Sequence, residues 1–299
     1  MQGLQPLIAF AQTARRGSFA AAARDLGGTP STVAKSVARL EASLGVRLFH
    51  RTTRQVTLTP DGERLFRRCE RVLSELDDLQ ADAAGTRATV GGTLRLDAPV
   101  TYGRKVLMPV LNALLRRHPE LRLDLRLQDS YADLVRDGLD AAIRVGELQD
   151  SRLVARRFDA QHLLLVASPA YLAERGEPLR LDQLAGHGAI VFRLPSSGRQ
   201  RPWQFRNGRQ AVSLLPTPSV EVNDGEGIVA AAVLGLGLAQ VPDNMVVDAI
   251  ARGELVELLP RNRPPAMPIS VVLPTSRLQP PRVRVLLEAL EAMPGRATR

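Results

Sequence analysis

Hydrophobic positions recur at helical spacing through the first 44 residues of the chain. Three segments, residues 4–14, 18–26 and 30–44, each place apolar side chains on one stripe at about 100° per residue. In the third segment the stripe contains Val33, Val37, Leu40 and Leu44, which we expect to face a core. Gly27 and Gly28 break the chain before it. Strand-like alternation follows over residues 47–58, so the pattern predicts a helix-turn-helix with a β-wing.

Short polar and long basic side chains lie opposite the apolar stripe of the third helix. Thr29 is a suitable N-cap, Pro30 fits the first helical position, and Ser31, Lys35 and Arg39 project outward. Such a surface allows close approach to a DNA groove. A solvated amphipathic helix would show nearly the same pattern, but the preceding helix and the glycine turn favour DNA reading. The residues predicted to contact DNA are Ser18, Thr29, Ser31, Thr32, Lys35, Ser36, Arg39, Arg51, Thr52 and Arg54.

The charge distribution strengthens this interpretation. Residues 1–60 carry eight Lys or Arg and two Asp or Glu, a net of +6, while residues 61–86 carry four against seven, a net of −3. A basic N-terminal domain beside an acidic segment indicates a local polyanion contact. The wing tip, residues 51–54, suits phosphate or minor-groove contact, with a solubilising loop as the alternative.

A second helical pattern covers residues 60–83. Its apolar positions alternate in steps of four and three, as in a coiled-coil seam: Leu65, Cys69, Val72, Leu76, Leu79 and Ala83. A helix that packs against its own domain would also show such a stripe. Cys69, the only cysteine, is most simply a small buried hydrophobe. Residues 85–92 contain three glycines and indicate a connection to the next domain.

From residue 93 onward, strand and helix patterns alternate. Strands are predicted at 94–98, 121–127, 141–145, 162–167, 189–193, 220–222, 238–241 and 269–273, and helices at 105–117, 131–138, 226–234 and 281–292. The first part has βαβαβ order, which implies a parallel sheet with flanking helices. The proline-rich segment 263–268 suggests a crossover, and Trp203 and Phe205 are expected to pack in this domain.

These features together resemble the LysR-type transcriptional regulators. The residues that carry the resemblance are Gly17-Ser18-Phe19, Ala21-Ala22-Ala23, Leu26, Thr29-Pro30-Ser31, Lys35, Arg39-Leu40-Glu41, Leu44-Gly45-Val46-Arg47-Leu48-Phe49, Arg51-Thr52, Leu58-Thr59 and Gly62. The chain departs from the pattern at Ala34, where many members have serine. The resemblance implies an all-α winged helix-turn-helix at 1–59, a dimerising linker helix at 60–86, and an effector-binding α/β domain at 87–299. That domain would have two subdomains and a cleft, as in periplasmic binding proteins.

Ligands of such α/β folds sit beyond the carboxyl ends of the strands. Two loops that open helices, 99–103 and 223–225, are therefore the expected lips of the cleft, and their backbone N–H groups favour an anionic effector. The residues expected at the lips and rim are Pro99, Val100, Thr101, Tyr102, Gly103, Gly146, Glu147, Ser168, Arg193, Asn223, Asp224 and Gly225. For Arg193, an exposed loop arginine without a ligand role is the alternative.

No pattern predicts an enzyme, a cofactor or a metal site. The four histidines are dispersed, and Gly235-Leu236-Gly237 precedes a strand rather than following one. The expected partners are double-stranded operator DNA, a small-molecule effector, further copies of the chain in a homodimer or homotetramer, and RNA polymerase. A DNA-binding protein without an effector is the runner-up, and an enzyme fused to a DNA-binding domain is third. Without a signal peptide or an apolar run of about 20 residues, we expect a cytoplasmic protein with no membrane contact.

Overall fold

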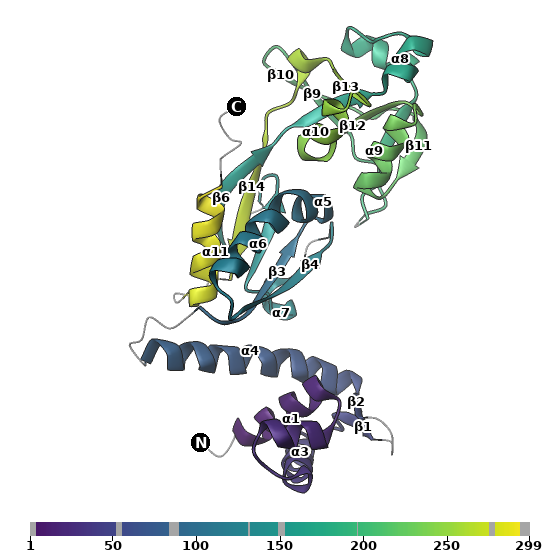
Figure 1. The fold of residues 1–299 in the computed structure, drawn as a ribbon. Helices are drawn as coiled ribbons and strands as arrows, with labels where there is room; N and C mark the ends of the chain where they lie inside the picture. The colour runs from purple at the N-terminus through teal and green to yellow at the C-terminus, as the bar shows by residue number, and fades with distance from the viewer. Residues whose placement is uncertain are drawn as a thin grey trace. The chain divides into compact units, whose positions relative to one another are not determined.

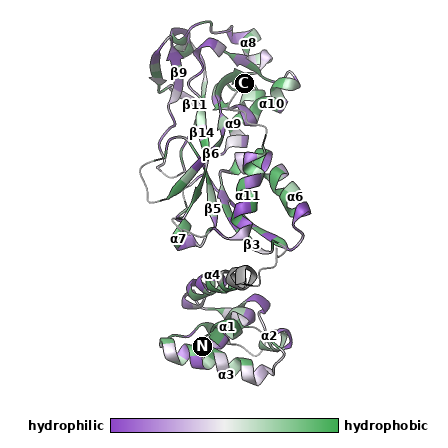
Figure 2. Ribbon diagram, turned by 90° about the vertical axis from the view of Figure 1, so that its left-hand side faces the viewer, coloured by the Kyte–Doolittle hydropathy of each residue, from purple (hydrophilic) through white to green (hydrophobic). Residues whose placement is uncertain are grey.

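The computed structural model describes residues 4–51, 56–83, 90–130, 132–148, 153–195, 197–274 and 279–293. The chain divides into two compact units: Met1–Thr93 with Val135–Gly138, and Leu94–Leu134 with Leu139–Arg299. Among the described residues, no helix is both long and apolar enough to cross a membrane. Even the long helix α4 (Pro60–Ala83) mixes hydrophilic and hydrophobic residues (Figure 2).

The first unit contains the predicted helix-turn-helix and wing (Figure 1). Its elements are α1 (Leu4–Arg16), α2 (Phe19–Asp25), α3 (Pro30–Leu44), β1 (Phe49–Arg51), β2 (Val56–Leu58) and α4 (Pro60–Ala83). Strands β1 and β2 pair antiparallel, with Phe49 opposite Leu58. Gly27 has φ of +65° between α2 and α3, a conformation that glycine adopts without the steric cost of a side chain.

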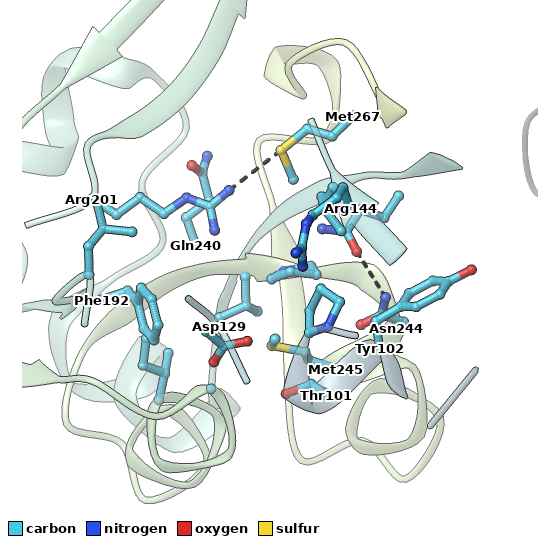
Figure 3. Close-up of a pocket in the computed structure, with 18 of the residues that line it drawn as sticks. Thr101, Tyr102, Asp129, Arg144, Phe192, Arg201, Gln240, Asn244, Met245 and Met267 are labelled. Atoms are coloured by element: carbon cyan, nitrogen blue, oxygen red, sulfur yellow. Dashed lines mark hydrogen bonds between the residues drawn. The ribbon is translucent and has the colours of Figure 1, made fainter. Parts of the chain in front are cut away.

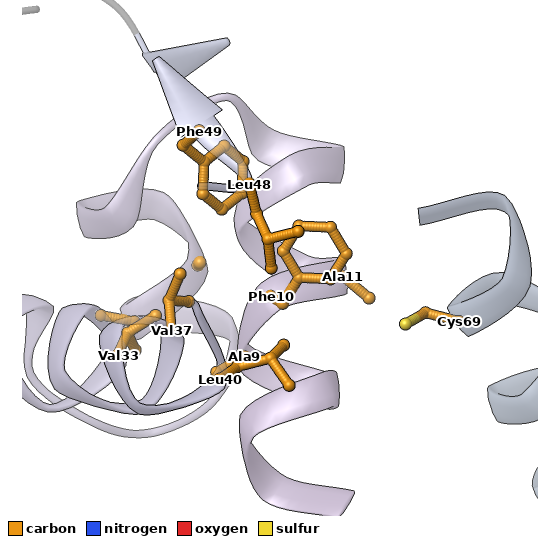
Figure 4. Packing of buried hydrophobic residues seen from close by; sticks show 11 residues of the cluster. Ala9, Phe10, Ala11, Val33, Val37, Leu40, Leu48, Phe49 and Cys69 are labelled. Carbon is orange, nitrogen blue, oxygen red and sulfur yellow. The ribbon is translucent and has the colours of Figure 1, made fainter. Parts of the chain in front are cut away.

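A small aromatic and aliphatic core holds these helices together (Figure 4). Phe10 of α1 is fully buried, and its ring centroid lies 5.3 Å from that of Phe49. Val33, Val37 and Leu40 of α3 are buried in the same core, as predicted.

The prediction that Leu44 also faces this core is wrong, because Leu44 is 47% exposed. Helix α3 ends at Leu44 with Gly45 in the left-handed conformation, so the last turn projects past the core. Glu41 is buried there instead, and its carboxylate accepts backbone hydrogen bonds from Leu48 at 2.8 Å and Phe49 at 3.3 Å. This carboxylate therefore attaches the start of the wing to the end of α3.

The first half of α4 packs on its own domain. Cys69 is 4% exposed in the helix-turn-helix core, as expected for a small hydrophobe, and Leu65, Phe66 and Leu73 pack against the same core. Burial and the neighbouring Glu70 charge raise the pKa of the Cys69 thiol to about 11. Val72 is 44% exposed. The first two residues of the predicted coiled-coil seam, Leu65 and Cys69, therefore pack on their own domain.

The second unit contains two mixed sheets with helices. Its first sheet is formed by β3 (Gly92–Ala98), β4 (Leu121–Leu127), β5 (Ala141–Val145), β6 (Val154–Gln161) and β14 (Met267–Leu273). Its helical segments are α5 (Val100–Tyr102), the π-helical turn η1 (Gly103–Leu107), α6 (Met108–Arg117) and α11 (Pro281–Glu291). The short helix α7 (Leu134–Asp137) has only Leu134 in this unit. The strand order is β4-β3-β5-β14-β6. Strands β3 and β5 are parallel, as predicted, but β14 runs antiparallel to both β5 and β6.

The second sheet has the order β11-β8-β12-β7-β13. Its strands are β7 (Leu163–Ala167), β8 (Ala189–Phe192), β11 (Pro218–Val222), β12 (Leu238–Pro242) and β13 (Val256–Leu258). Around it lie α8 (Pro169–Arg175), η2 (Leu181–Gly186), α9 (Gly225–Val233), α10 (Asp243–Ala251), η3 (Pro260–Asn262) and the hairpin β9 (Trp203–Asn207) and β10 (Gln210–Leu214). Trp203 and Phe205 are each 3% exposed in this core, as expected.

The chain passes between the two sheets along the paired strands β6 and β14. It leaves the first sheet after β6, forms the whole second sheet, and returns through β14. The proline-rich segment is therefore a crossover, as predicted. Each sheet with its helices forms one subdomain, which confirms the predicted multidomain chain with a C-terminal α/β part of two subdomains.

Candidate functional site

The start of α3 is fixed by its own side chains. Thr29 Oγ1 accepts a hydrogen bond from the backbone N–H of Thr32 at 3.2 Å and lies 2.8 Å from Thr32 Oγ1. This N-cap geometry satisfies one of the N–H groups that a helix start leaves unpaired. Thr29 and Thr32 therefore contribute to helix geometry as well as to the exposed surface.

The outer face of α3 presents the predicted polar and basic residues. Ser31, Lys35 and Arg39 are exposed, whereas Ala34 and Ser36 are half-buried. Ser18 caps α2, where its hydroxyl accepts a hydrogen bond from the Ala21 N–H at 3.3 Å. Arg51 has its backbone in β1. The side chain of Arg51, and the whole of Thr52 and Arg54, lie outside the described residues.

Ion pairs join the surrounding helices of the first unit. Arg16 Nε lies 2.6 Å from Asp25 Oδ2, which connects the ends of α1 and α2. Hydrogen bonds from Arg16 and then Gln12 lower the pKa of the Asp25 carboxyl. Arg15 Nε lies 2.8 Å from Glu70 Oε1 of α4. These contacts hold α2 and α4 on α1, and α2 in turn packs beside the outward-facing α3.

A cavity of about 630 Å³ lies between the two subdomains of the second unit (Figure 3). The first subdomain contributes Pro99, Thr101, Tyr102, Gln128, Asp129, Ser130, Arg144, Val145, Gln161 and Met267. The second contributes Phe192, Leu194, Arg201, Gly225, Ile228, Gln240, Val241, Pro242, Asn244 and Met245. The two expected lips meet here, since a Cβ on Gly225 would lie 3.1 Å from Thr101 Oγ1.

Four of the twelve residues expected at the cleft line this cavity: Pro99, Thr101, Tyr102 and Gly225. The other eight lie outside its lining: Val100, Gly103, Gly146, Glu147, Ser168, Arg193, Asn223 and Asp224. Two of these residues stabilise the local fold. Ser168 caps α8, and Gly103 packs so tightly that a Cβ there would lie 2.3 Å from Leu127 Cδ2. Arg193 is exposed in the loop after β8.

The charged residues of the lining, Asp129, Arg144 and Arg201, are not among those expected from the sequence. Arg144 had a visible signal, because it interrupts the otherwise apolar strand β5. Its side chain is 7% exposed and forms an ion pair with the fully buried Asp97. Arg144 also donates to the carbonyl of Ala132 at 3.0 Å, and Gln128 Nε2 donates to Asp97 at 2.7 Å. The floor of the cavity is therefore a hydrogen-bonded buried ion pair.

Carboxylates of the protein occupy both helix starts at the lips. Asp129 Oδ1 accepts a hydrogen bond from the Val100 N–H, the first of α5, at 3.1 Å. Asp224 Oδ2 accepts one from the Gly227 N–H of α9 at 2.8 Å. The role of Asp129 could not be assigned from periodicity, because α5 begins five residues before the predicted helix start at residue 105. Asp224, in contrast, lies in a loop that the sequence already placed at the start of a helix.

Two hydrogen bonds join the walls of the two subdomains (Figure 3), and a third lining residue, Gln240, is bound within the second subdomain. Arg201 Nη2 of the second subdomain donates to Met267 Sδ of β14 at 3.5 Å. Asn244 Nδ2 donates to Gln161 Oε1 at 3.1 Å, while the buried Asn244 Oδ1 has no hydrogen-bond partner in the described structure. Gln240 bonds both backbone groups of the residue that follows Trp203, at 2.7 and 2.6 Å. Within the described part of the chain, no cluster of His, Cys, Asp and Glu could hold a metal ion.

Comparisons with known proteins agree with both parts of this arrangement. Residues 4–63 match the bacterial regulatory helix-turn-helix protein, lysR family, and residues 87–294 match the LysR substrate binding domain. The chain is 35% identical over 291 residues to the HTH-type transcriptional regulator DmlR of Escherichia coli (strain K12), covering 96% of this chain and 93% of DmlR.

Solved structures of full-length regulators are also similar. The structure of CrgA, a LysR-type transcriptional regulator from Neisseria meningitidis, aligns with a TM-score of 0.62 at 32% identity over 96% of this chain and 97% of that chain. AphB, a Vibrio cholerae virulence activator, aligns with a TM-score of 0.61 at 26% identity over 96% and 98%. The chain therefore belongs to the LysR-type transcriptional regulators, as a DNA-binding regulator with an N-terminal helix-turn-helix and a C-terminal effector-binding domain.

Proposed function

We propose that this protein binds a partly symmetric operator through α3 and responds to a small, anionic effector in the cavity between its two subdomains. The observation that carries the DNA interface is the outer face of α3, where Ser31, Lys35 and Arg39 are exposed opposite a buried apolar stripe. Lys35 and Arg39 position the helix on phosphates, and Ser31 and Thr32 lie near base edges. We propose the domain bounds predicted from the sequence: 1–59, 60–86 and 87–299.

The regulator is proposed to act as a dimer or tetramer, with RNA polymerase as the partner at the promoter. The exposed Val72 supports pairing through the outer half of α4, because Leu65 and Cys69 of the same seam already pack on their own domain. In a dimer, two copies of α3 would enter successive major grooves about 34 Å apart.

DNA binding is tested by footprinting the purified protein on the DNA upstream of its own gene. Lys35→Ala is expected to weaken protection and to lower the slope of log affinity against log salt by about 0.9 for one lost phosphate contact. The matched control is Arg175→Ala, which removes an exposed cation of α8 in the other unit. The DNA interface is wrong if the wild type protects no site at low salt, or if Lys35→Ala binds like the wild type.

Effector binding is tested by thermal unfolding with fractionated metabolites. A ligand at about 100 times its dissociation constant should add about 2.7 kcal/mol to the free energy of unfolding. Arg144 and Arg201 in the lining support an anionic ligand. A protein that no fraction stabilises would instead be a DNA-binding protein without an effector.

A further inference from the structure

One buried polar atom at the cavity wall lacks the hydrogen bond that its burial requires. Within the described part of the chain, Asn244 Oδ1 is the only buried side-chain nitrogen or oxygen atom with no hydrogen-bond partner. Asn244 is 3% exposed and belongs to the lining of the cavity. Folded proteins pair nearly all such atoms, because an amide oxygen that leaves water without finding a new donor is destabilising. The unpaired oxygen therefore calls for a donor that the protein itself does not supply.

Neighbouring contacts fix the orientation of the Asn244 side chain. Asn244 Nδ2 donates to Gln161 Oε1 at 3.1 Å (Figure 3), and the Asn244 backbone N–H donates to the carboxylate of Asp243 at 2.8 Å. Turning the Asn244 carboxamide over would bring its oxygen against Gln161 Oε1, which is also an acceptor. The oxygen of Asn244 therefore stays on the side away from Gln161 Oε1, and its position is set before any ligand binds.

The hydrogen bond between Asn244 and Gln161 also joins the two subdomains. Gln161 is the last residue of β6 in the first subdomain, and Asn244 lies in the first turn of α10 in the second. Asn244 Oδ1 is covered by protein in this arrangement, so a ligand donor reaches it only after a small shift between β6 and α10. A ligand that pairs this oxygen binds the shifted arrangement more tightly and so favours it. One contact would then both hold the ligand and move one subdomain against the other.

The surrounding wall indicates which kind of donor fits. The lining residues next to Asn244 in the sequence are apolar: Val241, Pro242 and Met245. An ammonium carries three N–H donors, and a single acceptor would leave the others unpaired against this apolar wall. A carboxylate carries no donor, so it cannot pair the oxygen of Asn244. A hydroxyl carries one donor, which matches the one unpaired acceptor.

We infer that Asn244 Oδ1 accepts a hydrogen bond from a hydroxyl group of the effector. The effector class is then an acid that also carries a hydroxyl group, and not an acid with a wholly apolar body. Gln161 acts as a positioning residue, because it holds the amide nitrogen of Asn244. This assignment rests on the proposed function of the cavity as the effector site.

The test compares ligands that differ only in this group. The probes are 6-hydroxyhexanoate and the isomers of 3-(hydroxyphenyl)propionate, each beside its parent acid without the hydroxyl group and beside its methyl ether. The ether keeps the oxygen acceptor and loses the donor. Binding to the full-length protein is measured by ligand-observed NMR at millimolar concentration. We expect at least one hydroxy acid to bind about tenfold more tightly than both its parent acid and its ether.

Variants of Asn244 show whether this residue causes the preference for the hydroxyl group. Asn244→Leu, of similar size, removes the acceptor, so the hydroxy acid and its ether should bind this variant equally. Asn244→Asp keeps an acceptor oxygen and loses the donor to Gln161, so it should retain the preference even where every acid binds more weakly. Asn207→Leu is the matched control, because Asn207 is an exposed asparagine of the same subdomain outside the lining. It is expected to keep the wild-type preference.

Three results would overturn the assignment: no hydroxy acid binds, the parent acids or ethers bind as tightly as the hydroxy acids, or Asn244→Leu retains the preference. An equal loss in Asn207→Leu would overturn it as well, because the loss would not be specific to the cavity. Where Asn244→Leu does not fold, Asn244→Asp decides, and loss of the preference in Asn244→Asp counts against the assignment.

Footprinting and thermal unfolding of the same preparation separate these outcomes from the proposed function. A wild type that protects its operator and is stabilised by a metabolite fraction, but shows no preference for a hydroxyl group through Asn244, retains the proposed function and loses this assignment. A wild type that no metabolite fraction stabilises loses both.

Discussion

The buried carboxylate of Glu41 allows a direct test of how helix α3 and the wing are joined. Glu41 is 6% exposed, and its Oε1 accepts from the backbone N–H groups of Leu48 and Phe49 at 2.8 and 3.3 Å. Glu41→Ala would leave both donors without this acceptor. We expect the first unit to lose stability and the wing to lose its fixed position beside α3.

The magnitude follows from the two hydrogen bonds. A buried donor that loses its acceptor costs about 1–3 kcal/mol. Two donors, of which the 3.3 Å contact is the weaker, give an expected loss of about 2–4 kcal/mol. Since domains are stable by only about 5–15 kcal/mol, the variant should still fold but unfold at clearly lower urea concentration. Glu41→Gln keeps an acceptor oxygen, so it should lose less than half as much.

The unfolding of the two units can be followed separately in the same sample. Its single tryptophan, Trp203, is buried in the second unit, so tryptophan fluorescence follows that unit. Circular dichroism at 222 nm also follows the helices of the first unit. Glu41→Ala should shift the helical transition and leave the fluorescence transition unchanged. Glu63→Ala, an exposed glutamate in the first turn of α4, is the surface control and should shift neither.

Two results would refute this reasoning. The first is an unchanged helical transition in Glu41→Ala, which would mean that the two N–H groups find other acceptors at no cost. The second is an equal loss in Glu41→Gln, which would mean that packing or charge, and not the acceptor oxygen, provides the stability. Operator binding measured on the same variants would show whether wing position affects DNA affinity independently of folding.

Three further predictions follow from single contacts. Gly62→Ala should destabilise the first unit by about 2 kcal/mol or more, because the new Cβ would lie 2.1 Å from the carbonyl oxygen of Leu48. Gly28→Ala is the control, because no atom lies within 4 Å of its new Cβ, and urea unfolding measures both variants. Burial raises the pKa of Cys69 from 9.0 to about 11, so the thiol of the unfolded chain ionises first as pH rises through this interval. The free energy of unfolding should therefore fall over this pH range in the wild type and fall less in Cys69→Ala. Equal pH dependence of the two proteins would contradict this. Arg104 and Glu226 form a half-exposed ion pair at 2.8 Å between the subdomains, and a double-mutant cycle followed by fluorescence should give a coupling of about 0.2–1 kcal/mol that 1 M salt removes.

The sequence predicted most of the fold because much of it is periodic. The apolar stripe of Val33, Val37 and Leu40 and the alternation of strand β4 depend on local spacing, and the structure confirms them. Strand β6 was not predicted, because Arg156 and Arg157 interrupt any apolar alternation and its pairing with β14 comes from distant sequence.

Of the two candidate sites, one could be predicted from local spacing and the other could not. The surface of α3 could be derived from one helix, since burial of one stripe exposes the other side. The cavity could not, because its lining comes from many separate segments of two subdomains. The lips at Thr101 and Gly225 were expected from the loops that open helices. The position of Arg201 depends on how the β9–β10 hairpin docks, which no local pattern encodes.

The paired strands β6 and β14 make the second subdomain a single uninterrupted insert in the first. Gln161 ends β6 and Met267 begins β14, and the two residues are direct neighbours in the antiparallel register. An insert whose two ends are adjacent can be replaced without separating the strands that flank it. Residues 162–266 therefore form a natural cassette. Exchanging this cassette between relatives would replace one wall of the cavity while the helix-turn-helix unit keeps its sequence, a modular route to new regulators.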